Sequence, residues 1–395
     1  MEISPERDVS GANFSKGQIN LNWSMSSVGY VNPSKCFIKL RVKLYAGAAT
    51  TRLTRANGIA PNMFLPHNLF QSMRMMINNT TVSELNDYVG QCASLKHRMY
   101  TSEDRMKNYL EVTELSQAYL TERQEHVVSD VSPSGAAGGA DISPLNAVQF
   151  KRDVSIFELC FKPTLAFFDI DEYIPGCQGL FTLQLTPHPN VVFQQCAIES
   201  TVNKVVDTDF NFSVESMNMY IMRGIGEPVT SKSMTLQLRE VRCQSQNLTT
   251  NSIHQKTFQV HPRTEELTIA YQYSGASIQD TQYSATKFKC EAGDELNITR
   301  LWLSYGGKTL PDPIPDPEYN TTTKKDYLVQ RYVESLIYAN SLHSPEPMHK
   351  WLERGWYAHF SGFSAEEKED RVFVSSQFSA FAGSTNPNIL LFDWY

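Results

Sequence analysis

The sequence predicts an all-β protein with two antiparallel β-sandwich domains in tandem and a few short inserted helices. Three observations support this fold class: strand patterns recur along most of the chain, helical spacing is confined to two stretches, and the chain is long. Alternating apolar and polar residues bury one face of a strand and leave the other in water, which is typical of antiparallel sheets. At 395 residues, the chain exceeds what one hydrophobic core usually organises, so two domains of about 200 residues are expected.

The predicted strands are rich in β-branched and aromatic residues and are bounded by Gly, Pro, Asn or Ser. In chain order they are GQINLNWSM, CFIKLRVKLYA, SIFELCFKP, LFTLQLTP, FSVESMNMYIM, HQKTFQVHP, ELTIAYQYS, LNITRLWLSY, RVFVSSQFSAF and NILLFDWY.

A helix is predicted at about residues 86–110, and a second at about residues 325–342. The first follows the strand FQSMRMMI, the turn NNTT and a connection, and it opens with Asp87-Tyr88. The second follows the strand NITRLWLSY, the turn GGKT and a longer connection, and it opens with Asp326-Tyr327. The same order of parts in both halves predicts a duplicated unit.

The second helix carries an apolar face with helical spacing. Leu328, Tyr332 and Leu336 share this face, and we expect Val329 and Val333 to extend it.

The domain boundary is predicted after residue 209. The stretch NKVVDTDF is polar and rich in turn residues, and it precedes a new strand. The first domain therefore covers residues 1–209 and the second covers residues 210–395. Residues 128–147 are rich in Gly, Ala, Ser and Pro, which predicts a flexible loop within the first domain.

A proline-rich segment, residues 311–320, follows the second turn, with Pro311, Pro313, Pro315 and Pro317 at alternate positions. Proline lacks an amide donor and drives the residue before it towards extended geometry. The segment is therefore predicted to be a stiff, extended strap that cannot pair within a sheet.

The balance of charged residues limits the kinds of molecule that the chain is expected to bind. It holds 35 Lys and Arg against 42 Asp and Glu, a net charge of −7, which argues against direct binding of nucleic acid. Charged residues make up only 19%, which suits a protein whose sides are buried against neighbours. No secretory signal is recognisable and no apolar run reaches about 18 residues, so we expect an intracellular protein without a transmembrane segment.

Residues with chemical potential are few. The seven cysteines are scattered without a Cys-x-x-Cys pair, which favours buried free thiols over zinc or disulfide frameworks. Asp169, Asp171 and Glu172 could bind a cation or share a proton, but their place in a turn between apolar strands favours a solvated or capping role. Gly224 and Gly226 lack the third glycine of a phosphate loop and indicate a turn. We therefore predict no catalytic, cofactor-binding or metal-binding residues.

The order of the motifs resembles that of double jelly-roll major capsid proteins. The resemblance is carried by CFIKLRVKLYAG, LPHNLFQSMRMMINNTTVS before a Tyr-headed helix, FQVHPRTEELTIAY, ITRLWLSYGGKTLPDPIPDPEYN, DYLVQRYVESL and the closing RVFVSSQFSAFAGSTNPNILLFDWY. It covers about residues 15 to 395 and is strongest to the branch of Polinton/Maverick elements, adintoviruses and virophage-like DNA viruses. The turn NNTT departs from the pattern because it has no glycine.

This resemblance implies two tandem jelly rolls in a major capsid protein of the virion. Three copies would form a pseudo-hexameric homotrimer, or capsomer, that contacts neighbouring capsomers, penton proteins and minor capsid proteins in an icosahedral shell. No enzyme activity and no cofactor are implied. The strap with Pro311, Pro313, Pro315 and Pro317 becomes a candidate contact between subunits.

Two alternatives stay open at the level of sequence. Tandem jelly rolls also occur in carbohydrate- or amide-active hydrolases, which would need two converging carboxylates, and Asp169, Glu172 and Glu240 are available. A minor capsid protein is the other alternative, but we expect such a protein to be shorter and to have a single jelly roll.

Overall fold

The computed structural model describes most of the chain. The described residues are 1–26, 28–46, 59–61, 63–115, 156–175, 179–187, 193–195, 210–227, 235–248, 253–273, 296–310, 324–339, 346–348, 351, 357–361, 363, 369–381 and 387–395. The predicted loop at 128–147 and the strap with Pro311, Pro313, Pro315 and Pro317 lie outside them.

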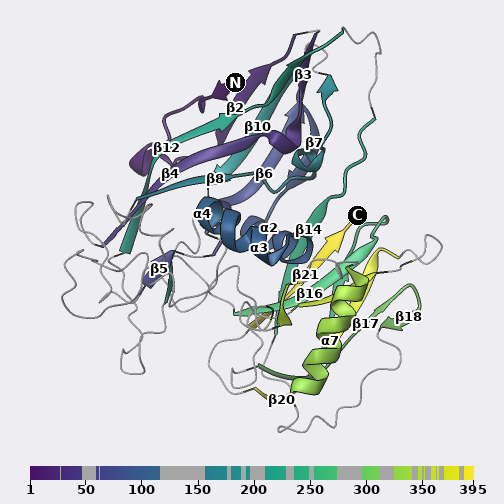
Figure 1. The fold of residues 1–395 in the computed structure, drawn as a ribbon. Helices are drawn as coiled ribbons and strands as arrows, with labels where there is room; N and C mark the ends of the chain where they lie inside the picture. Colours follow the sequence, from purple (N-terminus) through teal and green to yellow (C-terminus); the bar gives the residue numbers. More distant parts are fainter. Residues whose placement is uncertain are drawn as a thin grey trace. The chain divides into compact units, whose positions relative to one another are not determined.

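The described elements fall into two compact units (Figure 1). The first unit contains Met1–Ala93 and Lys107–Leu238, and the second contains Ser94–Met106, Arg239–Gly275 and Thr286–Tyr395. Because strands dominate both units, the predicted all-β class is confirmed.

The first unit is built on two four-stranded antiparallel sheets. Their orders are β1-β12-β4-β8 and β2-β10-β6-β7. The strands are β1 (Glu2–Ile3), β2 (Ile19–Ser24), β4 (Phe37–Ala46), β6 (Phe70–Ile77), β7 (Thr80–Leu85), β8 (Ile156–Phe161), β10 (Leu180–Pro187) and β12 (Phe210–Tyr220).

Shorter strands of the same unit form two small sheets, β11-β5 and β13-β3-β9. These strands are β3 (Gly29–Val31), β5 (Ile59–Pro61), β9 (Ile174–Pro175), β11 (Phe193–Gln195) and β13 (Arg223–Ile225).

The second unit also has two four-stranded antiparallel sheets. Their orders are β14-β21-β16-β19 and β15-β20-β17-β18. The strands are β14 (Val241–Asn247), β15 (Ile253–Gln259), β16 (Glu266–Tyr273), β17 (Leu296–Tyr305), β18 (Lys308–Leu310), β19 (Tyr357–Ser361), β20 (Arg371–Phe381) and β21 (Pro387–Trp394).

The two units share one topology. Counted along the chain within each unit, the first sheet has the order first, eighth, third, sixth, and the second has the order second, seventh, fourth, fifth. Eight antiparallel strands that return in this way across two sheets form a jelly roll. The prediction of two tandem jelly rolls is therefore confirmed, and the repeated order agrees with a duplicated unit.

The boundary between the units differs from the predicted one at residue 209. Strand β12 was expected to open the second domain, but it pairs with β1 and β4, for example Tyr220 with both Glu2 and Phe37. It is the eighth strand of the first jelly roll, and residues up to Leu238 group with that unit. The boundary therefore lies after β12, since β1 pairs only with β12 among the described strands.

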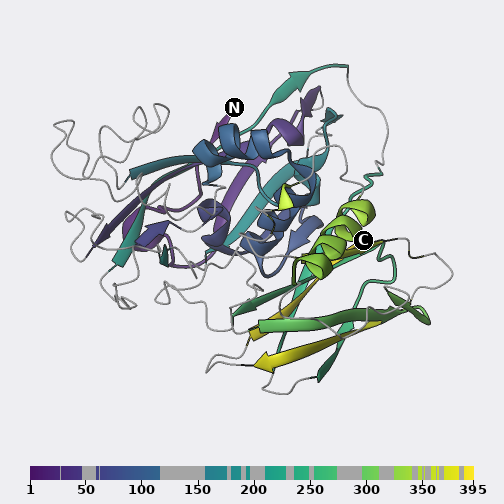
Figure 2. The ribbon, with the colours of Figure 1, turned by 60° about the horizontal axis from the view of Figure 1, so that its bottom comes forward.

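The helices lie after the fifth strand of each unit. In the first half they are α2 (Val89–Tyr100), α3 (Glu103–Arg105), a π-helical turn (Met106–Leu110) and α4 (Glu111–Glu114), preceded by the short α1 (Leu65–Asn68). In the second half, α7 (Lys324–Tyr338) lies against β19. Figure 2 shows α7 beside strands of the second unit. Helix α7 ends earlier than the predicted residue 342.

Two-residue turns join the fourth and fifth strands in both units. Asn78 and Asn79 have φ of 49° and 64°, and Gly306 and Gly307 have φ of 58° and 71°. Positive φ at both central residues matches the twist of a hairpin, and asparagine tolerates it better than other residues with a side chain. Asn78 also accepts a hydrogen bond from the amide of Leu180 at 2.8 Å. The missing glycine in NNTT therefore leaves the turn geometry intact.

We expect Gly307→Ala to destabilise the second unit by about 1 kcal/mol, because a β-carbon disfavours the left-handed conformation. A β-carbon there would meet nothing within 4 Å, so the cost comes from the backbone alone. Chemical denaturation measures it. Asn79→Gly is the matched control and should leave stability equal or higher; a loss on Asn79→Gly would contradict this account of the turns.

Candidate functional site

The predicted carboxylate group is dispersed on the surface. Asp169 binds Lys162 at 3.0 Å, whereas Asp171 accepts a hydrogen bond from Ser34 at 2.6 Å and pairs with Lys35 at 3.1 Å. The hydrogen bond from Ser34 and the ammonium of Lys35 hold the pKa of Asp171 below its usual value. The two aspartates therefore bind different neighbouring residues, and they do not form a pair directed at one site.

The other two residues considered for hydrolysis, Glu172 and Glu240, lie in different units. Glu172 is exposed, and Glu240 belongs to the second unit, where its backbone exchanges two hydrogen bonds with Tyr395.

Gly224 and Gly226 belong to and follow the small strand β13, which pairs with β3. A β-carbon on Gly226 would lie 2.6 Å from the ring of Tyr30, and one on Gly224 would lie 3.1 Å from the ring of Tyr173. The two glycines thus make room for aromatic rings on a sheet, and the predicted simple turn is corrected accordingly.

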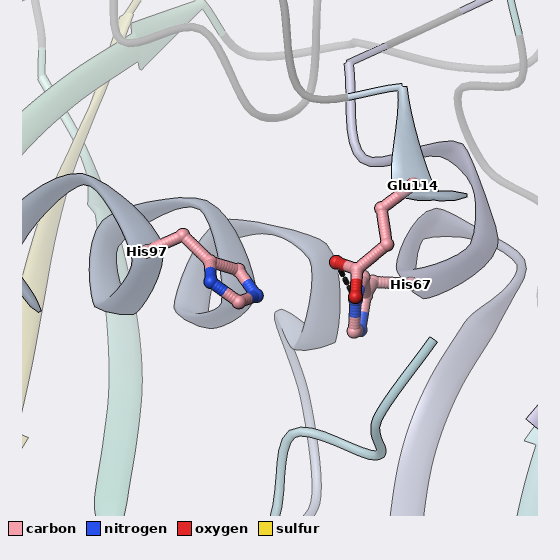
Figure 3. A group of neighbouring side chains, drawn as sticks. All are labelled: His67, His97 and Glu114. Atoms are coloured by element: carbon pink, nitrogen blue, oxygen red, sulfur yellow. Dashed lines mark hydrogen bonds and ion pairs between the residues drawn. The ribbon is translucent and has the colours of Figure 1, made fainter. Parts of the chain in front are cut away.

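A buried polar cluster lies in the first unit. Nε2 of His67 lies 3.0 Å from Oε2 of Glu114, and its Nδ1 lies 2.9 Å from the hydroxyl of Thr164 (Figure 3). The ring of Phe161 packs edge-on against His67 at 5.0 Å. His97, also labelled in Figure 3, lies in the part of α2 that groups with the second unit. The contacts of His67 join α1, α4 and the chain after β8, which is a structural role.

A buried ion pair lies in the second unit. Nε of Arg98 is 3.1 Å from both carboxylate oxygens of Glu346, and the two side chains are 0% and 1% exposed. The guanidinium also donates to the carbonyl of Trp351 and lies 5.0 Å from the ring centre of Tyr357. Arginine keeps its charge in proteins, so this position requires a carboxylate partner.

A second polar network lies on β16, β19 and β21. The indole of Trp394 donates to Thr268 at 3.1 Å, the hydroxyl of Thr268 lies 2.7 Å from Nδ1 of His359, and Nε2 of His359 lies 3.2 Å from Glu266. With Thr268 donating to Nδ1, a neutral His359 carries its proton on Nε2, the nitrogen that lies near the carboxylate of Glu266. Arg239 pairs with the same carboxylate.

Protonation of this network follows from burial. Burial lowers the pKa of His359, which favours the neutral ring. Burial acts to raise the pKa of Glu266, but His359 and Arg239 outweigh it and hold that pKa below the usual value. The carboxylate of Glu266 also accepts from the hydroxyl of Tyr100 at 3.1 Å. The carboxylate oxygens of Glu266 already contact Tyr100, Arg239 and His359. This arrangement favours a structural role over catalysis.

The exposed face of α7 is the feature that the sequence analysis placed incorrectly. Val329 and Val333 were expected on the packed face, but they are 43% and 42% exposed, and Ile337 is 55% exposed. The face towards β19 instead carries Arg331, Ser335 and Leu336, which are buried. The helical spacing of the apolar residues predicted an apolar face on this helix. It could not show which of these residues pack within the unit.

The described thiols agree with the prediction of free cysteines. Cys36, Cys92, Cys160 and Cys243 are free, and all but the half-buried Cys160 are buried. In the described part of the chain, none of the helices combines the length and apolarity needed to span a lipid bilayer.

We expect Arg98→Met to destabilise the second unit by about 3–5 kcal/mol, because the carboxyl group of Glu346 would be left buried without the guanidinium that now pairs with it. The double variant Arg98→Met/Glu346→Leu should recover most of this loss. Denaturant unfolding measures both. As a surface control, Arg74→Ala breaks the exposed pair with Glu84 and should cost at most about 1 kcal/mol. Equal losses for the buried and exposed pairs would contradict the assignment.

Acidification should weaken the fold through His359. Because its pKa is lower in the folded chain, the unfolded chain binds more protons below its ordinary pKa of about 6.5, so the free energy of unfolding falls as pH falls. One such group contributes at most about 1.4 kcal/mol per pH unit. Between about pH 7.5 and 5.5, His359→Gln should show a shallower decline than the unmodified protein. Identical slopes would show that His359 does not titrate in this way.

Comparison with known proteins gives a likeness of fold. No protein-family model matches the chain, and no curated protein matches it either. Among solved structures, the crystal structure of mavirus major capsid protein aligns with a TM-score of 0.52 and 11% identity, covering 100% of this chain and 86% of that one. A chain of the Sputnik virophage structure aligns with a TM-score of 0.55 and 11% identity, covering 100% and 85%. The chain thus has the double jelly-roll fold that these viral proteins share.

Proposed function

We propose that this chain is a major capsid protein that forms homotrimeric, pseudo-hexameric capsomers in the icosahedral shell of a DNA virus or virus-like element. The observation that carries the proposal is the presence of two jelly rolls with one strand order in a single chain. Three copies supply six similar domains, which suits a hexagonal position in a closed lattice.

Composition supports burial between subunits. Charged residues are 19% of the chain and hydrophobic residues are 41%. The interior of a protein interface is depleted of charge. The net charge of −7 fits a shell protein that does not itself neutralise a genome, since phosphate neutralisation requires clustered Lys and Arg.

The two alternatives receive less support. A hydrolase would need two carboxylates that converge on a substrate, whereas Asp169 and Asp171 bind different neighbours at the surface. A minor capsid protein was expected to have one jelly roll, and the described chain has two. We therefore propose a structural protein and no enzyme activity.

The partners follow from the proposed role. Each capsomer would contact neighbouring capsomers in the virion, with penton and minor capsid proteins at the remaining positions of the shell. The strap with Pro311, Pro313, Pro315 and Pro317 is proposed to brace a neighbouring subunit, because a stiff segment loses little entropy on docking.

Light scattering of the purified protein tests the capsomer directly. We expect a stable species of three chains, with a hexagonal outline in negative-stain images of the same peak. A monomer that persists at high concentration would overturn the proposal.

A further inference from the structure

One face of α7 is apolar and exposed in the described part of the chain. Val329, Val333 and Ile337, here called the α7 stripe, follow one another at every fourth position and are 43%, 42% and 55% exposed. Residues four apart share a helix face. The opposite side packs on β19, where Ser335 donates to the carbonyl of Tyr357. Helix α7 therefore packs within the unit through one side and leaves a row of large aliphatic side chains exposed on another, which marks an interaction surface.

The counterpart of this helix in the first half is α2. Each of the two helices follows the hairpin between the fourth and fifth strands of its jelly roll. Helix α2 begins in the first unit, but its residues from Ser94 onward group with the second unit. There Arg98 and Met99 are buried, and the ring of Tyr100 packs edge-on against Trp394 at 5.9 Å. The later part of the helix that follows the fifth strand of the first jelly roll thus groups with the second unit.

If the second half repeats the arrangement of the first, α7 should pack against the jelly roll that follows the second unit in an assembly. Within the chain, the described strands after α7 are β19, β20 and β21, which complete the second unit's own sheets. In a ring of three chains, the next jelly roll is the first unit of another copy.

The first unit carries an aromatic pair at the position equivalent to the receiving site. In the second unit, Trp394 is the last residue of the eighth strand and pairs with Glu266, the first residue of the third strand. In the first unit, Tyr220 is the last residue of the eighth strand and pairs with Phe37, the first residue of the third strand. The rings of Phe37 and Tyr220 stack at 5.1 Å with 14° between their planes, and Phe37 is 37% exposed.

Charged residues border both surfaces. Beyond Phe37, the outward positions of β4 are Lys39, Arg41 and Lys43. Next to the α7 stripe lies Glu334, which is partly exposed and pairs with Arg331. Since Lys39 and Arg41 already pair with Glu158 and Glu215, apolar burial supplies the strength of the contact.

We propose that the α7 stripe of one copy packs against the Phe37–Tyr220 pair on the first unit of a second copy. The inference rests on the proposed capsomer and assigns the residues of the contact between its copies. It gives each of the six jelly rolls of a trimer one helix from the jelly roll before it.

The test is the mass of Val333→Asp by light scattering, beside the unmodified protein at the same concentration. A carboxylate in the centre of the stripe would be buried in the contact, so the variant should fall from three chains to one. Its far-ultraviolet circular dichroism spectrum should match that of the unmodified protein, because Val333 lies on the surface of the single chain. Ile253→Asp is the matched control, since Ile253 is 60% exposed on β15 of the same unit, and it should stay trimeric.

A crosslink reports the contact directly, without placing a charge in it. Val333→Cys and Tyr220→Cys chains, both also carrying Cys160→Ser to remove the half-buried native thiol, are co-expressed and oxidised. A disulfide-linked pair should form only when both variants are present.

The outcomes separate this inference from the capsomer proposal. A trimer that survives Val333→Asp and gives no mixed disulfide would overturn the α7 contact and leave the capsomer standing. A monomeric unmodified protein would overturn both.

Discussion

The alternation of side chains in a two-layer sandwich is the constraint on which the rest of this structure depends. Inward residues of every strand build the core, so the outward residues must either face water or be covered. Strand β4 turns Ile38, Leu40 and Val42 inward, all 0% exposed, and turns cations outward. Strand β16 instead is buried on both faces from Leu267 to Gln272, because its outer face also packs against other elements of the unit. Charged outward residues thus go with a sheet face that meets water, and buried outward residues go with a face that is covered.

Local pattern was sufficient to locate most strands. All ten predicted strand segments correspond to strands of the structure, because their β-branched and aromatic residues report burial directly. Strand β14, VRCQSQN, was missed because polar residues hide its weak alternation. The domain boundary was misplaced because the identity of β12 as an eighth strand depends on its pairing with β4, which is distant in sequence. Alternation of apolar and polar residues identifies a strand, but it does not show with which other strand it pairs.

The buried polar groups could not be predicted for the same reason. Arg98 and Glu346 are 248 residues apart, and nothing near Glu346 in the sequence marks it as buried. Arg98 did carry a local signal, a cation within the apolar spacing of a helix, but such residues are more often exposed at a helix edge. On α7, periodicity revealed apolar rows and could not decide between packing inside a unit and packing against another molecule. The resemblance to capsid proteins supplied the jelly-roll topology, which composition alone does not determine.

The central claim is that two jelly rolls in one chain become six in an assembly of three copies. A cryo-electron microscopy reconstruction of the purified protein tests it most directly. The account predicts three chains per particle with six jelly rolls in a pseudo-sixfold ring, and with Val329, Val333 and Ile337 covered by a neighbouring chain. Single chains, or an assembly of any other copy number, would contradict it.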